Sequence, residues 1–331
     1  MTKIAVLGSG SFGTSLAHIY ARKGIETCLW ARDEKLAEEI NTTNRNSRYL
    51  PELKLHPELR ASGNAKAVLQ NADIVLSVIP SQFTRCTLTE FREYLPSGKL
   101  VVCASKGIEL NSLKLMPTVL EESLRGLNIP VAQLSGPSFA GEMIEGQPTS
   151  VVLGCSNEEA VTEARDILST DNFRVYSSTD LIGVGLGGAV KNVIAIATGI
   201  CDGLGFQDNA RAAIITRGLA EMSRLGVAMG ARKETFMGLS GMGDLVLTCS
   251  GDQSRNKQVG IQLGQGMDIK TITSSTCTVA EGVKTTQALY ELGKAMHVEL
   301  PITAQVYSVL YNNTTPEDGV KKLMSRSLKD E

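Results

Sequence analysis

The sequence lacks the features that mark several classes of protein. Its 331 residues contain no basic run and carry a formal net charge of −2, which gives no support for nucleic-acid or membrane-surface binding. The seven cysteines are odd in number and include no C-x-x-C pair, a pattern that favours reduced thiols over disulfides or a zinc site. His18, His56 and His297 are far apart in sequence and suggest no metal site. The first apolar run is too short for a signal peptide, so we expect a soluble cytoplasmic protein without membrane insertion.

The hydrophobic pattern changes near residue 180. Before it, strand-like runs alternate with helical patterns, which predicts a mainly parallel, doubly wound sheet. The expected strands are Ile4–Leu7, Thr27–Trp30, Ile74–Ile79, Leu100–Ala104, Val131–Leu134, Ser150–Leu153 and Phe173–Tyr176. After it, helices are expected at 181–202, 209–229, 255–264, 280–294, 301–311 and 317–324. The predicted fold class is therefore α/β, with an N-terminal Rossmann-type domain over 1–180 and a C-terminal all-α domain over 181–331. We expect Asn41–Pro57 to be a long loop and the ligands to lie in the interdomain cleft.

A glycine-rich turn follows the first expected strand. Gly8-Ser-Gly-Ser-Phe-Gly13 is a G-x-G-x-x-G sequence placed between a β-rich run and an amphipathic helix. Gly8 permits the tight turn, Gly10 lets the backbone approach a pyrophosphate, and Gly13 lets helix and strand pack closely. The N–H groups at the helix start favour the phosphate charge. The motif predicts a dinucleotide site, and the alternative is a tight turn without a ligand.

The end of the second expected strand bears on the choice of cofactor. An acidic residue near this position usually binds the ribose diol of NAD, and Asp33 lies about the expected distance along the chain. Arg32 lies closer to the strand end, where an arginine can pair with a 2′-phosphate. We therefore expect NADP(H) to be accepted, with NAD(H) also possible. The alternative is two solvated residues that open a helix.

Lys191 is the only charged side chain between Asp180 and Asp202. Burial disfavours the ammonium form and lowers the pKa of a lysine, unless an anion or hydrogen-bonding partners hold the charge. A lysine of this kind can exchange a proton at physiological pH. One alternative is a snorkelling lysine on a half-buried helix. Another is a membrane span, in which Lys191 and Asn192 near the centre would be costly.

Further polar motifs follow expected strands or begin expected helices. Lys106, after one strand, would place a cation in the cleft, and Gly136-Pro-Ser138, after another, would offer N–H groups and a hydroxyl. Ser254-Arg-Asn256 combines an arginine, an amide and a helix start, which suits a phosphate dianion. The alternatives are a surface lysine, an ordinary helix entry with Ser138 as the cap, and an exposed helix opening. Asp244 can equally be a plain N-cap.

Together these residues resemble bacterial NAD(P)-dependent glycerol-3-phosphate dehydrogenase over essentially the whole chain. The matching segments are Gly8–Gly13, Ser105–Gly107, Ser135–Ala140, Gly188–Ala195, Gly241–Asp244, Ser254–Asn256 and Val279–Gly282. The resemblance implies reversible interconversion of dihydroxyacetone phosphate and sn-glycerol 3-phosphate, feeding phospholipid synthesis. It also implies a homodimer formed through the helical domain.

The resemblance further implies roles for individual residues. Lys191 corresponds to the general acid/base, with Asp244 and Thr248 as supporting polar groups. The implied substrate contacts are Lys106, Gly136, Ser138, Lys191, Asp244, Ser254, Arg255 and Asn256. The implied cofactor contacts are Ser11, Phe12, Arg32, Lys106, Ala140, Arg255, Val279 and Glu281, beside the turn glycines. Phe12 stands where the family often has Trp or Tyr, and Arg32 where it often has His.

Two other functions are compatible with parts of this pattern. A 3-hydroxyacid or 6-phosphogluconate-type dehydrogenase also pairs a Rossmann unit with a lysine-bearing helical domain, although Ser254-Arg-Asn256 fits it less well. The second is a non-catalytic NAD(P) sensor. Lys191 in an apolar helix argues against this function, because a sensor needs no proton relay.

Overall fold

The computed structural model of the protein describes residues 2–274 and 280–327. The chain divides into two compact units. The first unit comprises Met1–Lys106 and Met116–Gly185, and the second comprises Gly107–Leu115 and Leu186–Glu331.

The first unit is built on an eight-stranded sheet with the order β10-β9-β8-β7-β6-β1-β2-β5. Its strands are β1 (Lys3–Leu7), β2 (Glu26–Trp30), β5 (Arg60–Ser62), β6 (Ile74–Ser77), β7 (Leu100–Cys103), β8 (Val131–Ser135), β9 (Thr149–Cys155) and β10 (Phe173–Ser178). Neighbouring strands are parallel except β8 and β9, which are antiparallel. The predicted α/β class with a mainly parallel sheet is confirmed.

Helices cover both faces of this sheet. They are α1 (Ser11–Arg22), α2 (Glu34–Thr43), α3 (Ala65–Leu69), α4 (Thr84–Glu90), α5 (Met116–Ser123), α6 (Ala140–Glu145) and α7 (Glu158–Leu168). Alternate residues of β1 enter different cores: Ile4 and Val6 pack with residues of α1 and α7, whereas Ala5 and Leu7 pack with residues of α3, α4 and α5. Burial on both faces explains why β1 is continuously apolar rather than alternating.

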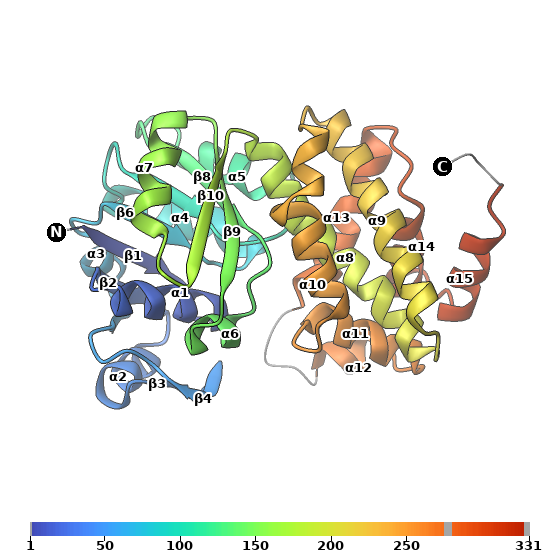
Figure 1. The fold of residues 1–331 in the computed structure, drawn as a ribbon, viewed down its shortest axis with the longest axis horizontal. Helices are drawn as coiled ribbons and strands as arrows, with labels where there is room; N and C mark the ends of the chain where they lie inside the picture. The colour runs from blue at the N-terminus through green and yellow to red at the C-terminus, as the bar shows by residue number, and fades with distance from the viewer. Residues whose placement is uncertain (1, 275–279, 328–331) are drawn as a thin grey trace. The chain divides into compact units, whose positions relative to one another are not determined.

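The segment 41–57 is not the long loop that its polar composition predicts. Helix α2 continues to Thr43 and ends at Asn44, which has a positive φ of 54°. Strands β3 (Arg45–Asn46) and β4 (Leu50–Lys54) then form an antiparallel hairpin, which lies beside α2 in Figure 1. The few apolar residues of this segment are enough to hold the hairpin on the first unit, because Leu50 and Leu55 are buried in the core of that unit.

The boundary between the units lies a little later than residue 180. Helix α8 (Leu181–Gly203) runs unbroken through it, and the first turn of α8 packs on the sheet. A Cβ on Gly154 of β9 would lie 3.0 Å from Val184 of this turn, which shows how close the approach is. Residues 107–115 group with the second unit because Ile108 and Leu115 are buried in its core.

The second unit is helical. Besides most of α8 it contains α9 (Asp208–Ala228), α10 (Asp244–Ser250), α11 (Arg255–Gly264), α12 (Ile269–Ser274), α13 (Glu281–Ala295), α14 (Pro301–Tyr311) and α15 (Pro316–Met324). Asp180 caps the start of α8: its Oδ1 accepts a hydrogen bond from the Gly183 N–H at 2.9 Å.

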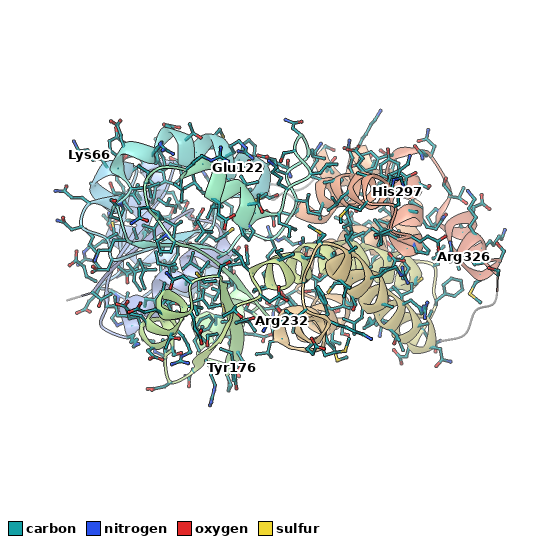
Figure 2. All side chains as sticks on the ribbon, turned by 90° about the horizontal axis from the view of Figure 1, so that it is seen from above. Lys66, Glu122, Tyr176, Arg232, His297 and Arg326 are labelled. Atoms are coloured by element: carbon teal, nitrogen blue, oxygen red, sulfur yellow. The ribbon has the colours of Figure 1, made fainter. Side chains whose placement is uncertain are left out.

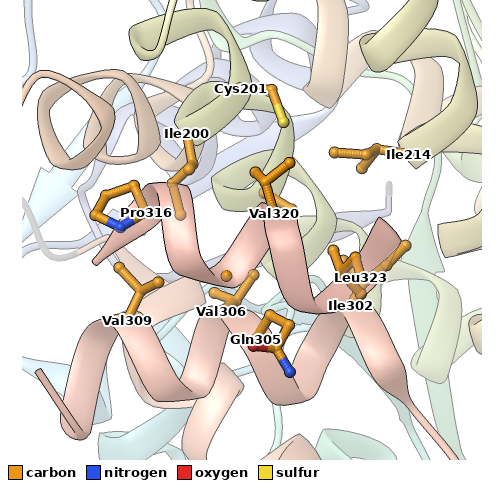
Figure 3. A pocket seen from close by; sticks show the side chains of 12 residues that line it. Ile200, Cys201, Ile214, Ile302, Gln305, Val306, Val309, Pro316, Val320 and Leu323 are labelled. Atoms are coloured by element: carbon orange, nitrogen blue, oxygen red, sulfur yellow. The ribbon is translucent and has the colours of Figure 1, made fainter. Parts of the chain in front are cut away.

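Helix α8 is the core of the second unit. Among the described residues it alone is long and apolar enough to span a membrane, and 94% of its apolar window is buried inside the protein. This burial is typical of the central helix of a globular domain. A small apolar cavity of about 30 Å³ remains where α15 covers α8 and α14, lined by Ile200, Val306 and Val320 among others (Figure 3).

The three histidines are not gathered in one place. The rings of His18 and His56 lie 6.4 Å apart in the first unit, whereas His297 lies on the surface of the second (Figure 2). Over residues 2–274 and 280–327, no group of three or more His, Cys, Asp or Glu side chains is placed to hold a metal ion. The six described cysteines all have free thiols.

Candidate cofactor and substrate sites

The glycine-rich turn joins β1 to α1, and its three glycines differ in what constrains them. Gly8 has a φ of 118°, and a Cβ there would lie 2.7 Å from the Val78 carbonyl oxygen. A Cβ on Gly13 would lie 2.0 Å from the Gly8 carbonyl oxygen, so the close packing of helix on strand requires glycine. A Cβ on Gly10 would meet no described atom within 4 Å. The fold itself therefore does not require glycine at position 10, which fits a ligand that approaches the backbone there.

The start of α1 is suited to an anion. Its N-cap is Gly10, no side chain caps the first turn, and that turn contains no acidic residue. The Ser11 hydroxyl donates to the Tyr49 carbonyl at 3.1 Å and so ties the turn to the β3–β4 hairpin. Backbone N–H groups and the helix dipole at such a start favour a phosphate.

Four predicted contact residues of the first unit converge near this turn. The Lys106 ammonium lies 5.7 Å from the centre of the Phe12 ring and donates to the Gly136 carbonyl at 3.2 Å. The Ser138 hydroxyl donates to the same carbonyl at 2.9 Å, and it does not cap the following helix α6, whose N-cap is Phe139. Gly136 has a φ of 143°, and a Cβ there would lie 2.8 Å from the Val151 Cα, so only glycine fits. The structure thus places a cation, an aromatic face and a hydroxyl together.

The other predicted contact residues of this unit lie nearby in the fold. The Ala140 carbonyl accepts a hydrogen bond from the Ser15 hydroxyl of α1 at 2.9 Å, which joins α6 to the helix of the glycine turn. Arg32 is exposed just beyond the end of β2. Asp33 caps α2 through the Lys35 N–H at 3.1 Å, so it does open a helix, and it also pairs with Arg48 at 2.8 Å. The Arg48 guanidinium lowers the pKa of Asp33.

In the second unit, Lys191 of α8 is held by two side chains of α10. Its Nζ donates to Asp244 Oδ1 and, at 2.9 Å, to Thr248 Oγ1. The lysine and aspartate side chains are 10% and 0% exposed. The snorkelling interpretation is therefore wrong, because the charged end of Lys191 lies inside the unit. Asp244 belongs to the first turn of α10, whose N-cap is Gly243, so it is not a plain N-cap either.

Close backbone packing brings α10 to Lys191. A Cβ on Gly187 of α8 would lie 2.3 Å from the Ser240 carbonyl oxygen, in the π-helical turn Leu239–Gly243 before α10. A Cβ on Gly241 of that turn would lie 2.2 Å from the Phe236 carbonyl oxygen. Glycine at position 187 lets the turn lie against α8, and glycine at position 241 lets the turn fold closely over Phe236; together they set Asp244 and Thr248 opposite Lys191.

Helix α11 packs on α8 by the same means. Gly199 and Gly203 of α8 face Gly260 and Gly264 of α11, and a Cβ on any of the four would lie 2.1–2.4 Å from a carbonyl oxygen of the other helix. Helices without side chains at the contact can approach more closely than the usual ~8–10 Å between axes. This contact holds the start of α11, and with it the Ser254-Arg255-Asn256 segment, beside the helix that carries Lys191.

The three residues of this segment have different surroundings. The Ser254 hydroxyl caps α11 by accepting from the Lys257 N–H at 3.3 Å. Arg255 is exposed in the first turn. Asn256 Oδ1 accepts from the Gly282 N–H at 3.0 Å, next to the half-buried Glu281 at the start of α13. Val279 lies outside the described residues.

Sequence reasoning missed two positions that organise these sites. Asn46 is buried in the β3–β4 hairpin and donates to the Ser9 carbonyl at 2.9 Å. Lys257 is buried beneath the Ser254–Asn256 segment, donates to the Ser250 carbonyl at 3.0 Å and lies 3.5 Å from Asp202. Neither belongs to a motif. For Asn46, the sequence offered only the high Asn and Arg content of the segment 41–57, and that composition predicted a loop rather than a structural role for this side chain.

A Rossmann-type glycine turn in one unit and a buried, carboxylate-paired lysine in a helical unit define the class: an NAD(P)-dependent dehydrogenase. The family model described as the N-terminus of NAD-dependent glycerol-3-phosphate dehydrogenase matches residues 3–161, and that of the C-terminus matches residues 180–321. A glycerol-3-phosphate dehydrogenase [NAD(P)+] of Maridesulfovibrio salexigens is 55% identical over 329 residues, which cover 99% of this chain and 100% of the relative.

Solved structures agree with this match. Glycerol-3-phosphate dehydrogenase from Coxiella burnetii superposes with a TM-score of 0.93 at 38% identity, covering 98% of this chain and 99% of the other. A ketopantoate reductase from Ralstonia eutropha, with a TM-score of 0.64 at 17% identity over 96% of this chain and 100% of the other, shares the fold alone. The chain therefore belongs to the glycerol-3-phosphate dehydrogenase [NAD(P)+] family, EC 1.1.1.94, and its cofactor is NAD(H) or NADP(H).

Proposed function

We propose that the protein reversibly reduces dihydroxyacetone phosphate to sn-glycerol 3-phosphate, with Lys191 as general acid/base. The observation that carries this proposal is the buried contact of Lys191 with Asp244 and Thr248. Bound NAD(P)H supplies the hydride to the substrate carbon. The Lys191 ammonium donates the proton to the carbonyl oxygen, and in the reverse direction the neutral amine accepts it from the hydroxyl. Asp244 and Thr248 orient the amine, and the negative charge of Asp244 favours the ammonium form.

The phosphate of the substrate is assigned to the start of α11. Arg255 is exposed there and can form paired hydrogen bonds with phosphate oxygens. Ser254 and Asn256 flank it, and the N-terminal end of a helix favours an anion. From the family resemblance we also propose Lys106, Gly136 and Ser138 as substrate contacts. This function requires that the cofactor on the first unit reach the substrate on the second.

Variants of Lys191 test the proton step. Lys191→Met should lower kcat by ~10²–10⁴-fold, the usual contribution of general acid/base catalysis, while the Kd for NADPH stays the same. Lys191→Arg keeps the positive charge but does not release its proton near neutral pH, so its kcat should also be low. Retention of most of the kcat by the arginine variant would show that only the charge matters.

Variants of two arginines test the phosphate contact. Arg255→Ala should raise the KM for dihydroxyacetone phosphate because a charged hydrogen-bonding partner is lost. Arg326→Ala is the matched control, since Arg326 is an exposed arginine of the same unit that pairs with Glu299 at 3.1 Å. An unchanged KM in Arg255→Ala would contradict the assignment.

The cellular setting follows from the proposed product. Glycerol 3-phosphate would supply glycerophospholipid synthesis in the cytoplasm, where the free thiols of the described cysteines would stay reduced. We also propose a homodimer formed through the helical unit. Exposed apolar side chains on this unit, including Phe206, Val227 and Met237, support it. Light scattering coupled to size-exclusion chromatography should give twice the 35.4 kDa chain mass, and a monomer would contradict it.

A further inference from the structure

The carboxylate expected to bind the ribose diol of NAD is already occupied. Asp33 follows β2, where an acidic residue usually selects NAD. Its Oδ1 accepts from the Lys35 N–H at 3.1 Å, and its Oδ2 pairs with Arg48 Nη2 at 2.8 Å. The Arg48 and Asp33 side chains are 51% and 37% exposed, so a ligand can reach both. Asp33 thus has a cation beside it rather than standing as an isolated negative charge.

The hairpin holds Arg48 in this position. On one side of Arg48, Asn46 donates to the Ser9 carbonyl at 2.9 Å and accepts from the Tyr49 N–H at 3.2 Å. On the other side, the Tyr49 carbonyl accepts from the Ser11 hydroxyl at 3.1 Å. These bonds fix the residues on both sides of Arg48 onto the glycine-rich turn. In Figure 1, β3 and β4 lie below α1.

Ser47 adds a further anchor for the hairpin. Its N–H and its hydroxyl donate to the two oxygens of the Glu39 carboxylate at 2.9 and 3.0 Å, which ties the hairpin turn to α2. Arg48 therefore projects from a turn that is attached both to α2 and to the nucleotide-binding turn. A side chain so placed can be selective for one part of a bound nucleotide.

We infer that Arg48 determines cofactor choice: by neutralising Asp33 it lets the site accept the 2′-phosphate of NADP(H) beside Arg32. The inference rests on the proposed contact between Arg32 and that phosphate. Asp33 and Arg48 together carry no net charge, so Arg32 remains the uncompensated cation for a phosphate. Without Arg48, the negative charge of Asp33 would offset the positive charge of Arg32 and would repel the 2′-phosphate of NADP(H). The same carboxylate could still bind the ribose diol of NAD(H). The effect should therefore be specific for NADP(H).

Direct binding measurements test this without turnover. Quenching of the fluorescence of Trp30, at the end of β2, can report the Kd of NADPH and of NADH in the full-length protein. Arg48→Ala should weaken NADPH binding by about tenfold, because the uncompensated Asp33 carboxylate repels the 2′-phosphate, and change NADH binding less than about twofold. The double variant Arg48→Ala/Asp33→Asn should recover most of the NADPH affinity, because the uncompensated carboxylate is gone.

A neighbouring arginine supplies the matched control. Arg45 lies in the same hairpin, but its guanidinium donates to the Pro51 carbonyl at 3.2 Å, so Arg45→Ala should change neither Kd. Equal weakening of NADPH and NADH in Arg48→Ala would show a merely structural role and overturn the inference, as would failure of Asp33→Asn to restore NADPH binding. Failure of the proposed function is distinguishable: it would appear as no reduction of dihydroxyacetone phosphate with either cofactor. A failed Arg32 contact would appear as unchanged NADPH binding in Arg32→Ala.

Discussion

Removal of Lys191 should destabilise the protein as well as inactivate it. The Asp244 side chain is fully buried, and its Oδ1 contacts the Lys191 ammonium. Lys191→Met keeps the length and apolar stem of the side chain but leaves the Asp244 carboxylate without its cation. Removal of one partner of a buried ion pair typically costs about 3–5 kcal/mol, because the remaining charge is uncompensated. That is a large part of a total stability of about 5–15 kcal/mol.

The double variant separates this charge effect from lost packing. Asp244→Asn in the Lys191→Met background removes the orphaned charge while it keeps the shape of the side chain. We expect the double variant to regain most of the loss and to remain within about 1 kcal/mol of the wild type, roughly the net worth of one hydrogen bond. Both variants should stay inactive, since neither has the amine.

Urea denaturation followed by two probes measures these changes. Far-UV circular dichroism follows the helices of both units, whereas the fluorescence of Trp30, the single tryptophan of the chain, follows the first unit. Lys191→Met should lower the free energy of unfolding obtained from circular dichroism. Wild-type stability in Lys191→Met, or a double variant less stable than the single one, would refute the view that Lys191 compensates the charge of Asp244.

Three further outcomes follow from single contacts. Burial lowers the pKa of His18 from 6.5 to about 4, so between these pH values the unfolded chain binds a proton at His18 that the folded chain does not. The free energy of unfolding should therefore fall as the pH drops from 6.5 towards 4, by roughly 3 kcal/mol in total. A urea-stability profile of His18→Asn should lack this loss. Burial raises the pKa of the Cys249 thiol to about 12, so iodoacetamide at pH 8 should label the exposed Cys86 and spare Cys249 in the native protein; rapid labelling of Cys249 would contradict its burial. A Cβ at Gly260 would lie 2.2 Å from the Ile196 carbonyl oxygen, so Gly260→Ala should lower the free energy of unfolding by about 1–3 kcal/mol, measured by thermal or urea unfolding. Gly238→Ala is the control and should lower it less, because the nearest atom to a Cβ there is 3.4 Å away.

Local features were predictable because they depend on neighbours in the chain. The parallel sheet follows from continuous apolar runs such as that of β1. The glycine turn was predictable from spacing alone. The β3–β4 hairpin was not, because its stability depends on the burial of Leu50 and on bonds from Asn46 to a turn 37 residues away.

Site geometry depended on contacts that no local pattern encodes. The sequence by itself determined the fold class, the nucleotide turn and the presence of an isolated lysine in an apolar helix, since periodicity and spacing are local properties. Only the tertiary structure showed that Lys191 donates to Asp244, 53 residues away, from inside the helical unit, and that Arg48 pairs with Asp33. The physical reason is that both pairs form where glycine contacts and buried hydrogen bonds bring distant segments together, and such packing depends on the whole fold.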